Sequence, residues 1–102
     1  MKPAAAREAI LSHLAETQED LKQRYSLERI AVIGSMARGD YGDDSDVDLI
    51  VRFKPGTQHI HDLKRDLRDE LEGVFRRPVQ IASEKYLKSY YRSQVLKEAV
   101  YV

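Results

Sequence analysis

The sequence contains no cysteine and no long hydrophobic run. The lack of cysteine excludes disulfides, thiolate zinc sites and a cysteine nucleophile, so any bound metal must take oxygen or imidazole ligands. No apolar stretch is long enough to span a bilayer, and the N-terminal residues lack the apolar segment and cleavage site of a secretory signal. We therefore expect a soluble, cytoplasmic protein with no membrane partner.

An excess of charge of one sign is also missing, because 17 basic residues offset 17 acidic ones. No global positive field attracts nucleic acid, and we expect no direct nucleic-acid partner. Charged residues make up 33% of the chain and apolar residues 42%, a balance typical of folded proteins. With 102 residues, we expect a single domain spanning positions 1–102, because a core of this size leaves no room for a second.

The spacing of apolar residues predicts helices packed against a small sheet. Two amphipathic helices are predicted, one over about residues 3–25 with Ala6, Ile10, Leu14, Leu21 and Tyr25, and one with Ile60, Leu63, Leu67, Leu71 and Val74. A third helix is expected to start near Ser83, a suitable N-cap residue. Short β-branched or alternating runs predict strands at 27–33, 46–53 and 77–82, with a short edge strand at 99–102. The chain is therefore expected to form an α+β domain.

The most informative pattern begins where the first predicted strand ends. Gly34-Ser35 is followed, after ten intervening residues, by Asp46-Val47-Asp48. Because side chains alternate along a strand, Asp46 and Asp48 share one face while Val47 points into the core. Two carboxylates roughly 7 Å apart repel each other unless a cation lies between them. Mg²⁺ suits this place, since it takes one or two carboxylates and completes its shell with water and substrate phosphates.

The residues around the turn suit a triphosphate. Gly34 lets the backbone approach a phosphate closely, and Ser35 presents its hydroxyl and N–H at the start of a short helical turn. Arg38, one turn further on, is placed to neutralise phosphate charge. Two magnesium ions about 3.5–4 Å apart would clamp the attacking and leaving oxygens of an in-line displacement at phosphorus. The pattern therefore predicts a site for a nucleoside triphosphate and its metal.

Two competing motifs fail on spacing. A calcium loop that begins at Asp44 needs glycine and glutamate at the places where Leu49 and Pro55 stand. A P-loop needs a lysine followed by serine or threonine after its second glycine, and Asp40-Tyr41 stands there instead. Neither motif explains the aspartates.

These residues resemble a known family, the minimal nucleotidyltransferases of the polymerase-β-like superfamily, whose signature is Gly-Ser, about ten residues, then Asp-x-Asp. The segments 34–39 and 45–49 match the family's two blocks, and the chain length, flanking helices and C-terminal segment 96–101 are similar to its small prokaryotic members. The resemblance implies a polymerase-β-like nucleotidyltransferase fold with a small mixed sheet flanked by helices. It also implies Mg²⁺ and ATP as cofactors.

The resemblance carries roles onto the matching positions. Asp46 and Asp48 would bind the metal and serve catalysis, and Gly34, Ser35 and Arg38 would bind the nucleotide. Small members of the family typically act as antitoxins beside a HEPN-domain ribonuclease toxin, and some transfer AMP from ATP to a tyrosine of that toxin. A HEPN-domain toxin is therefore the partner that the resemblance implies.

One departure from the family pattern concerns catalysis. Active members usually carry a third carboxylate on the following strand, and Gln80 has the place and face expected of it here. An amide cannot act as a general base and is a poor ligand for Mg²⁺. Two interpretations follow: a chain that binds Mg-ATP and transfers AMP slowly, or a catalytically impaired binding module that neutralises its partner by occlusion.

The remaining polar and aromatic residues are interpreted as structural. Surface positions are expected for three histidines and two arginines: His13, His59, His61, Arg76 and Arg77. Four tyrosines either pack on helices and strands or form an exposed partner surface, and both alternatives stay open: Tyr86, Tyr90, Tyr91 and Tyr101.

Overall fold

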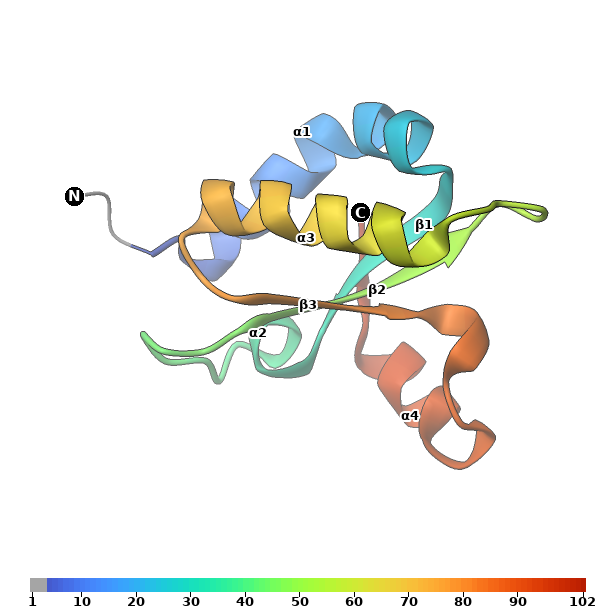
Figure 1. Ribbon diagram of the computed structural model, residues 1–102. Helices are drawn as coiled ribbons and strands as arrows, with labels where there is room; N and C mark the ends of the chain where they lie inside the picture. Colours follow the sequence, from blue (N-terminus) through green and yellow to red (C-terminus); the bar gives the residue numbers. More distant parts are fainter. Residues whose placement is uncertain (1–3) are drawn as a thin grey trace.

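The computed structural model describes residues 4–102. In chain order the elements are α1 (Arg7–Tyr25), β1 (Leu27–Ile33), α2 (Gly34–Arg38), β2 (Val47–Phe53), α3 (Ile60–Phe75), β3 (Val79–Ser83), the 3-10 helix η1 (Glu84–Tyr86), α4 (Ser89–Glu98) and β4 (Val100–Tyr101) (Figure 1). Among the described residues, no helix has the length and apolar character needed to cross a membrane.

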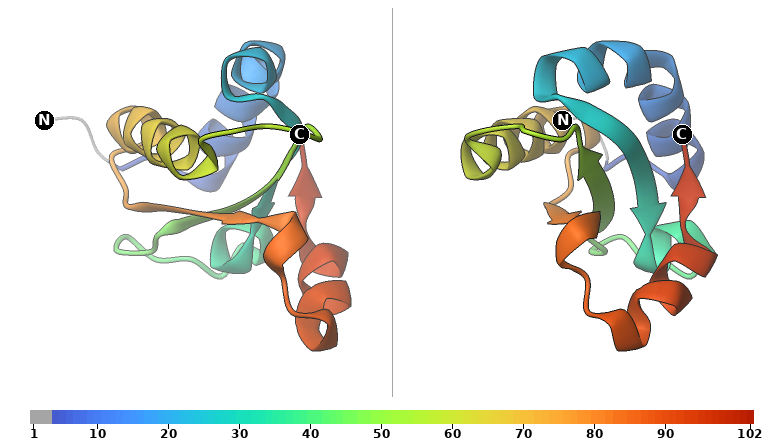
Figure 2. Two further views of the ribbon diagram at one scale, coloured as in Figure 1. Left: turned by 45° about the vertical axis from the view of Figure 1, so that its right-hand side comes forward. Right: turned by 90° about the vertical axis from the view of Figure 1, so that its right-hand side faces the viewer.

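The four strands form one mixed sheet in the order β3-β2-β1-β4. β1 is antiparallel to both β2 and β4, whereas β2 and β3 run parallel. Figure 2 shows α1 and α3 on one face of the sheet and α2 and α4 toward the other. The prediction of an α+β fold with a small mixed sheet flanked by helices is confirmed, including the edge strand near the C-terminus.

The main core lies between the sheet and the pair α1 and α3. Its buried members come from both helices and from the strand face beneath them: Ile10, Leu14, Leu21, Tyr25, Leu67, Leu71, Phe75, Ile30, Val32, Val47, Leu49 and Val51. Because every second strand residue points at the helices, the alternate residues Asp48 and Arg52 of β2 face the other side. The core therefore fixes which face of β2 carries the acidic residue.

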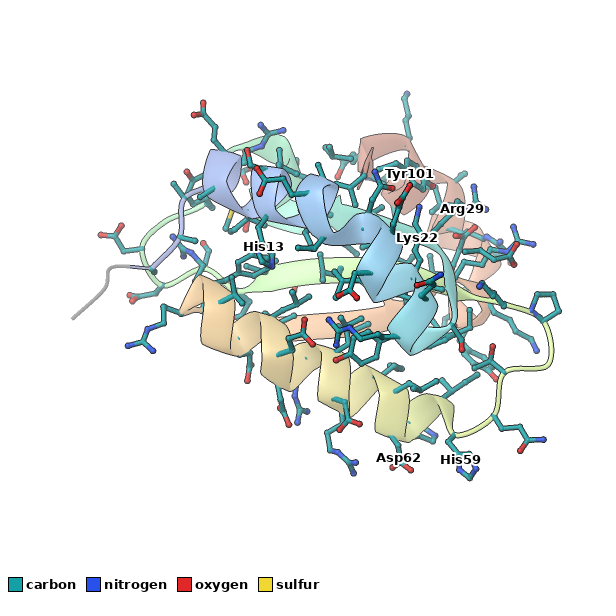
Figure 3. All side chains as sticks on the ribbon, turned by 90° about the horizontal axis from the view of Figure 1, so that it is seen from above. His13, Lys22, Arg29, His59, Asp62 and Tyr101 are labelled. Atoms are coloured by element: carbon teal, nitrogen blue, oxygen red, sulfur yellow. The ribbon has the colours of Figure 1, made fainter. Side chains whose placement is uncertain are left out.

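Three expectations about the core and its surroundings are wrong. Val74 is 46% exposed, and Phe75 is buried in its place at the end of α3. His13 is half-buried rather than a surface residue, because its ring packs edge-on against Phe75 at a centroid distance of 5.6 Å. In Figure 3, His13 points from α1 toward α3. Ala6 is exposed and precedes the first helical residue, Arg7.

The predicted start of the last helix is also wrong. Ser83 ends β3, where it pairs with Val51, and its side chain makes no capping hydrogen bond to η1. The α-helix begins only at Ser89, after η1 and a short connection. Tyr86 is 69% exposed, so it is not a packing residue. The side chains of Tyr90 and Tyr91 lie outside the described part of the structure.

Candidate functional site

The turn after β1 has a backbone conformation that depends on glycine. Gly34 has φ of +71°, a left-handed conformation that glycine adopts without steric cost. The short helix α2 starts there and ends at Gly39, which is also left-handed and donates its N–H to the Ser35 carbonyl. Arg7 reaches over from α1 and donates to the carbonyls of Met36 and Ala37, at 2.9 and 3.3 Å. These bonds satisfy carbonyls that a helix end leaves without a partner.

Asp48 lies directly against this turn. A Cβ atom added to Gly34 would stand 2.8 Å from Asp48 Oδ2, closer than such atoms approach in proteins. The antiparallel register explains the contact, because Ile33 at the end of β1 pairs with Asp48 near the start of β2. The structure therefore brings together Gly34, Ser35 and Asp48, which the sequence pattern had linked by spacing alone.

Asp46 and Gln80 complete the candidate site. Asp46 immediately precedes β2, and Gln80 Nε2 donates a hydrogen bond to its Oδ2 at 3.1 Å. Gln80 pairs with Asp48 in the parallel ladder between β2 and β3. The Gln80 side chain is therefore in contact with Asp46, one of the two aspartates of the pair.

Electrostatics mark Asp48 as an unusual carboxyl group. Burial, and secondarily the negative charge of Asp46, raise the pKa of Asp48 above its ordinary value. Among the described residues, no ion pair involves Asp46 or Asp48. A half-buried carboxylate beside a like charge is unfavourable unless a cation joins it. The acidic pair is thus suited to a cation that arrives with a ligand.

The donor set fits Mg²⁺ held jointly with phosphate. The described residues contain no group of three or more histidine, cysteine or acidic side chains that would form an all-protein metal cage. Two carboxylate side chains remain, and Mg²⁺ is commonly bound by one or two carboxylates plus substrate phosphates and water. Because Gly34 has no side chain, the Asp48 carboxylate lies directly against the turn, where it would meet a phosphate bound by the turn.

Arg77 organises the loop that leads into this site, although the sequence suggested a solvated position. Its side chain is buried, with a residue exposure of 6%. Nε donates to the Ala5 carbonyl at 2.7 Å, and Nη1 donates to the carbonyls of Gly42, Asp43 and Ser45 at 3.0, 3.1 and 3.0 Å. The one signal in the sequence for this role is the loop that contains Gly42, Asp43 and Ser45. It has few apolar residues, and its backbone carbonyls need hydrogen-bond donors from elsewhere in the chain.

Arg38 has a less direct relation to the acidic pair. It is exposed at the end of α2, where it donates to Asp40 at 3.1 Å and to Glu98 at 3.4 Å. The hydrogen bond that Arg38 donates to Asp40, the negative charge of Asp40 and the hydrogen bond donated to Glu98 all raise the pKa of Arg38. Exposed pairs of this kind are weak, so the guanidinium can turn toward a phosphate at little cost.

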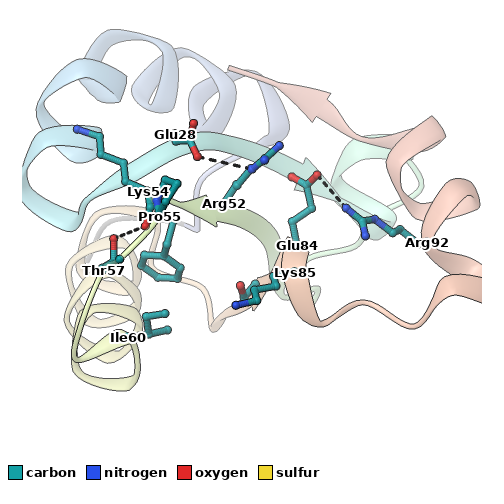
Figure 4. Close-up of a pocket in the computed structure, with 12 residues that line it drawn as sticks. Glu28, Arg52, Lys54, Pro55, Thr57, Ile60, Glu84, Lys85 and Arg92 are labelled. Carbon is teal, nitrogen blue, oxygen red and sulfur yellow. Dashed lines mark hydrogen bonds and ion pairs between the residues drawn. The ribbon is translucent and has the colours of Figure 1, made fainter.

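A separate pocket of about 390 Å³ lies at the opposite end of β1 and β2 (Figure 4). Glu84 lies in its wall with an exposure of 3%, ion-paired with Arg29 at 2.9 Å and Arg92 at 3.6 Å. Arg52 pairs with Glu28 at 3.6 Å across the same pocket. None of the residues predicted from sequence to bind nucleotide lines this pocket.

Residues 14–102 match the family model described as a nucleotidyltransferase domain. The chain is 35% identical over 97 residues to the protein adenylyltransferase MntA of Thermococcus cleftensis, covering 93% of this chain and 94% of that protein. It is 32% identical over 77 residues to MJ0435 of Methanocaldococcus jannaschii, assigned as a protein adenylyltransferase, covering 76% of this chain and 81% of the relative.

Solved structures share the fold. One that is assigned as a minimal nucleotidyltransferase superposes with a TM-score of 0.79 at 34% identity, covering 94% of this chain and 95% of the other. A toxin-antitoxin structure with AMP-PNP superposes with a TM-score of 0.67 at 18% identity, covering 84% of this chain and 69% of the other. At that identity the second likeness concerns the fold alone.

Proposed function

Because the chain belongs to the nucleotidyltransferase domain family, among its minimal nucleotidyltransferases, we propose that it binds Mg-ATP at the turn after β1. The observation that carries this proposal is the position of Asp48 Oδ2, which lies where a side chain at Gly34 would stand, beside the second carboxylate Asp46. Ser35 would hold the triphosphate through its hydroxyl and backbone N–H, and Arg38 would turn from Asp40 to neutralise phosphate charge.

Asp46 and Asp48 are the residues that would hold Mg²⁺. When bound, the metal would neutralise charge on the triphosphate and orient it for in-line displacement. The Asp48 carboxyl has a raised pKa before any cation is present, so binding Mg²⁺ requires it to be ionised. We therefore expect nucleotide binding to be stronger above the pKa of Asp48 than below it.

The proposed reaction is the transfer of AMP to a protein hydroxyl. The acceptor oxygen forms a bond to the α-phosphorus of ATP, the bond from that phosphorus to the β-phosphate oxygen breaks, and pyrophosphate leaves. The proton of the hydroxyl passes to water or a basic group at the site. The name of the Thermococcus relative, protein adenylyltransferase MntA, supports this class of reaction.

We propose a toxin protein as the acceptor, with this chain as the antitoxin. A toxin-antitoxin structure with the same fold supports the pairing, and the family resemblance suggests a HEPN-domain ribonuclease with an acceptor tyrosine. Neutralisation would then follow from adenylylation of that tyrosine. We propose that the chain acts in the cytoplasm with this partner.

The test is a labelling reaction with purified chain, co-expressed toxin, ATP and Mg²⁺. Mass spectrometry should find the toxin heavier by one AMP on a tyrosine. The Asp46→Asn/Asp48→Asn double variant should lose this transfer by at least about 100-fold, because the charges that bind the metal are gone. An unmodified toxin that the wild-type chain nonetheless neutralises would contradict the proposed reaction.

Gln80 favours a second candidate, a binding module that neutralises the toxin by occlusion. Its amide donates to Asp46 and supplies no basic oxygen of carboxylate strength. The Gln80→Asp variant separates the candidates. If the third carboxylate limits catalysis, this variant should transfer AMP faster than wild type. If neutralisation works by occlusion, the Asp46→Asn/Asp48→Asn variant should neutralise the toxin as well as wild type does.

A further inference from the structure

A groove runs along the open edge of β3, next to the acidic pair. It has a volume of about 330 Å³ and is lined by His61, Lys64, Arg65, Arg68, Val79, Gln80 and Ile81. A second hollow of about 500 Å³ shares His61 and Lys64 with it and extends to the exposed ring of Tyr86. Gln80, at one end of this path, is the residue that contacts Asp46. The groove thus leads along the edge of the sheet to the candidate site.

The backbone of β3 offers free hydrogen-bonding groups to this groove. Within the described chain, β3 pairs with β2 alone. Successive residues of a strand direct their N–H and C=O groups to opposite edges. The Pro78 carbonyl accepts from Val47 on the β2 side, and the Val79 N–H is directed to Glu72 Oε2 on the other. Ile81 therefore presents its N–H and C=O at the open edge, whereas Gln80 and Ala82 face β2.

Charge on α3 is segregated with respect to the groove. Basic side chains recur at helical spacing on the side that lines it: His61, Lys64, Arg65 and Arg68. Acidic residues occupy the neighbouring outer stripe: Asp62, Asp66 and Asp69. In Figure 3, Asp62 points outward from the first turn of α3. Glu72, near the end of α3, accepts a hydrogen bond from the Val79 N–H at 2.9 Å.

The acidic stripe neutralises the basic one only weakly. Arg65 lies 3.4 Å from both Asp62 and Asp66, and Arg68 lies 3.0 Å from Asp69, but all these side chains are at least 45% exposed. Exposed ion pairs contribute little and exchange partners readily. An acidic ligand in the groove can therefore compete for these guanidinium groups.

We propose that the groove binds an extended, acidic segment of the acceptor protein, which adds to the sheet as a strand beside β3. This inference rests on the proposed transfer function and names how its acceptor docks. Main-chain hydrogen bonds to Ile81 would give affinity, as in other cases of strand addition. Because side chains of a strand alternate, acidic residues would face the basic side of α3 while the acceptor hydroxyl faces Gln80 and the acidic pair.

The docking test uses fluorescent poly(Glu,Tyr), with poly(Lys,Tyr) and poly(U) as comparison polymers, and needs neither ATP nor Mg²⁺. Wild type should bind poly(Glu,Tyr) and not poly(Lys,Tyr). The Lys64→Glu/Arg65→Glu/Arg68→Glu variant should weaken the binding at least tenfold. A control with the same charge change elsewhere, Lys22→Glu/Lys54→Glu/Lys88→Glu, should stay within twofold of wild type. Equal losses in both variants, or a preference for poly(U), would overturn the proposal.

Strand addition has its own readout in amide hydrogen exchange. Saturating poly(Glu,Tyr) should slow exchange of the Ile81 amide at least tenfold, while the amides of Gln80 and Ala82, already directed at β2, serve as internal controls. Unchanged exchange at Ile81 in the bound state would overturn strand addition. Because neither binding nor exchange is measured with ATP or Mg²⁺ present, a failure of AMP transfer leaves this result distinguishable.

Discussion

The two ends of strands β1 and β2 hold their acidic side chains in opposite ways. At the pocket end, Glu84 is almost fully buried and is held by Arg29 and Arg92. At the other end, Asp48 is half-buried beside Asp46, and neither forms an ion pair with a described residue. A buried acid with its own cations belongs to the fold, whereas one beside a like charge is typical of a functional site. Burial alone would have selected the pocket end.

The largest expected effect concerns how much Arg77 stabilises the loop that leads to Asp46 and Asp48. Arg77→Ala removes the donors of four backbone carbonyls and should lower the free energy of unfolding by about 3 kcal/mol. Arg76→Ala is the control, since Arg76 is exposed at the neighbouring position and should change stability by about 0.5 kcal/mol or less. Urea denaturation measures both. Similar losses for the two variants would mean that the Arg77 bonds do not stabilise the loop.

The next prediction contrasts Glu84, expected to serve stability, with Asp48, expected to serve Mg-ATP binding. Glu84→Gln weakens the pairs with Arg29 and Arg92, and should cost about 2 kcal/mol of stability while Mg-ATP still binds. Asp48→Asn should not lower stability, but it should abolish Mg-ATP binding. Calorimetric titration and urea denaturation separate the two quantities. If Glu84→Gln abolished nucleotide binding at full stability, the functional site would lie at the pocket end.

A smaller effect is expected from a single methyl group at the turn. Gly34→Ala and Gly39→Ala both place a side chain at positive φ and should each cost about 1 kcal/mol. Only Gly34→Ala places its Cβ against Asp48 Oδ2, since nothing lies within 4 Å of a Cβ at Gly39. Mg-ATP affinity should therefore fall in Gly34→Ala and hold in Gly39→Ala. Equal Mg-ATP affinities in the two variants would mean that Asp48 does not take part in nucleotide binding.

The smallest effect concerns pH. The pKa of Asp48 in the folded protein lies above the ordinary value of 3.8, so this carboxyl binds more protons in the folded state and its contribution to wild-type stability falls as pH rises above 3.8. Asp48→Asn lacks this loss and should be more stable at pH 7, by about 0.5 kcal/mol. The difference should shrink below pH 3.8. A wild type that is the more stable protein at pH 7 would contradict the raised pKa.

Local patterns predicted most of the fold. The bounds of β1 agree with the prediction, because a short β-branched run ends at a glycine with positive φ. The start of α4 was wrong because the relevant contacts are remote: Ser83 pairs with Val51, and Glu84 is held by Arg29 from another strand. No nearby residue carries that information.

The site divides in the same way. The spacing of Gly34 and Asp48 predicted their proximity, since the connection between two antiparallel strands brings their ends together. The contact between Gln80 and Asp46 needed the order of strands in the sheet as well. Arg77 was missed, because its acceptors lie 32 to 35 residues away in one loop and 72 residues away in the N-terminal segment.

The same arginine has a consequence for how the protein is made. During synthesis, Gly42, Asp43 and Ser45 leave the ribosome long before Arg77 does, so their carbonyls lack their buried donor. The loop before Asp46 can take its final shape only once residue 77 has been added and β3 can pair with β2. A nascent chain that already contains the whole Gly-Ser and Asp-x-Asp pattern therefore still lacks an organised site.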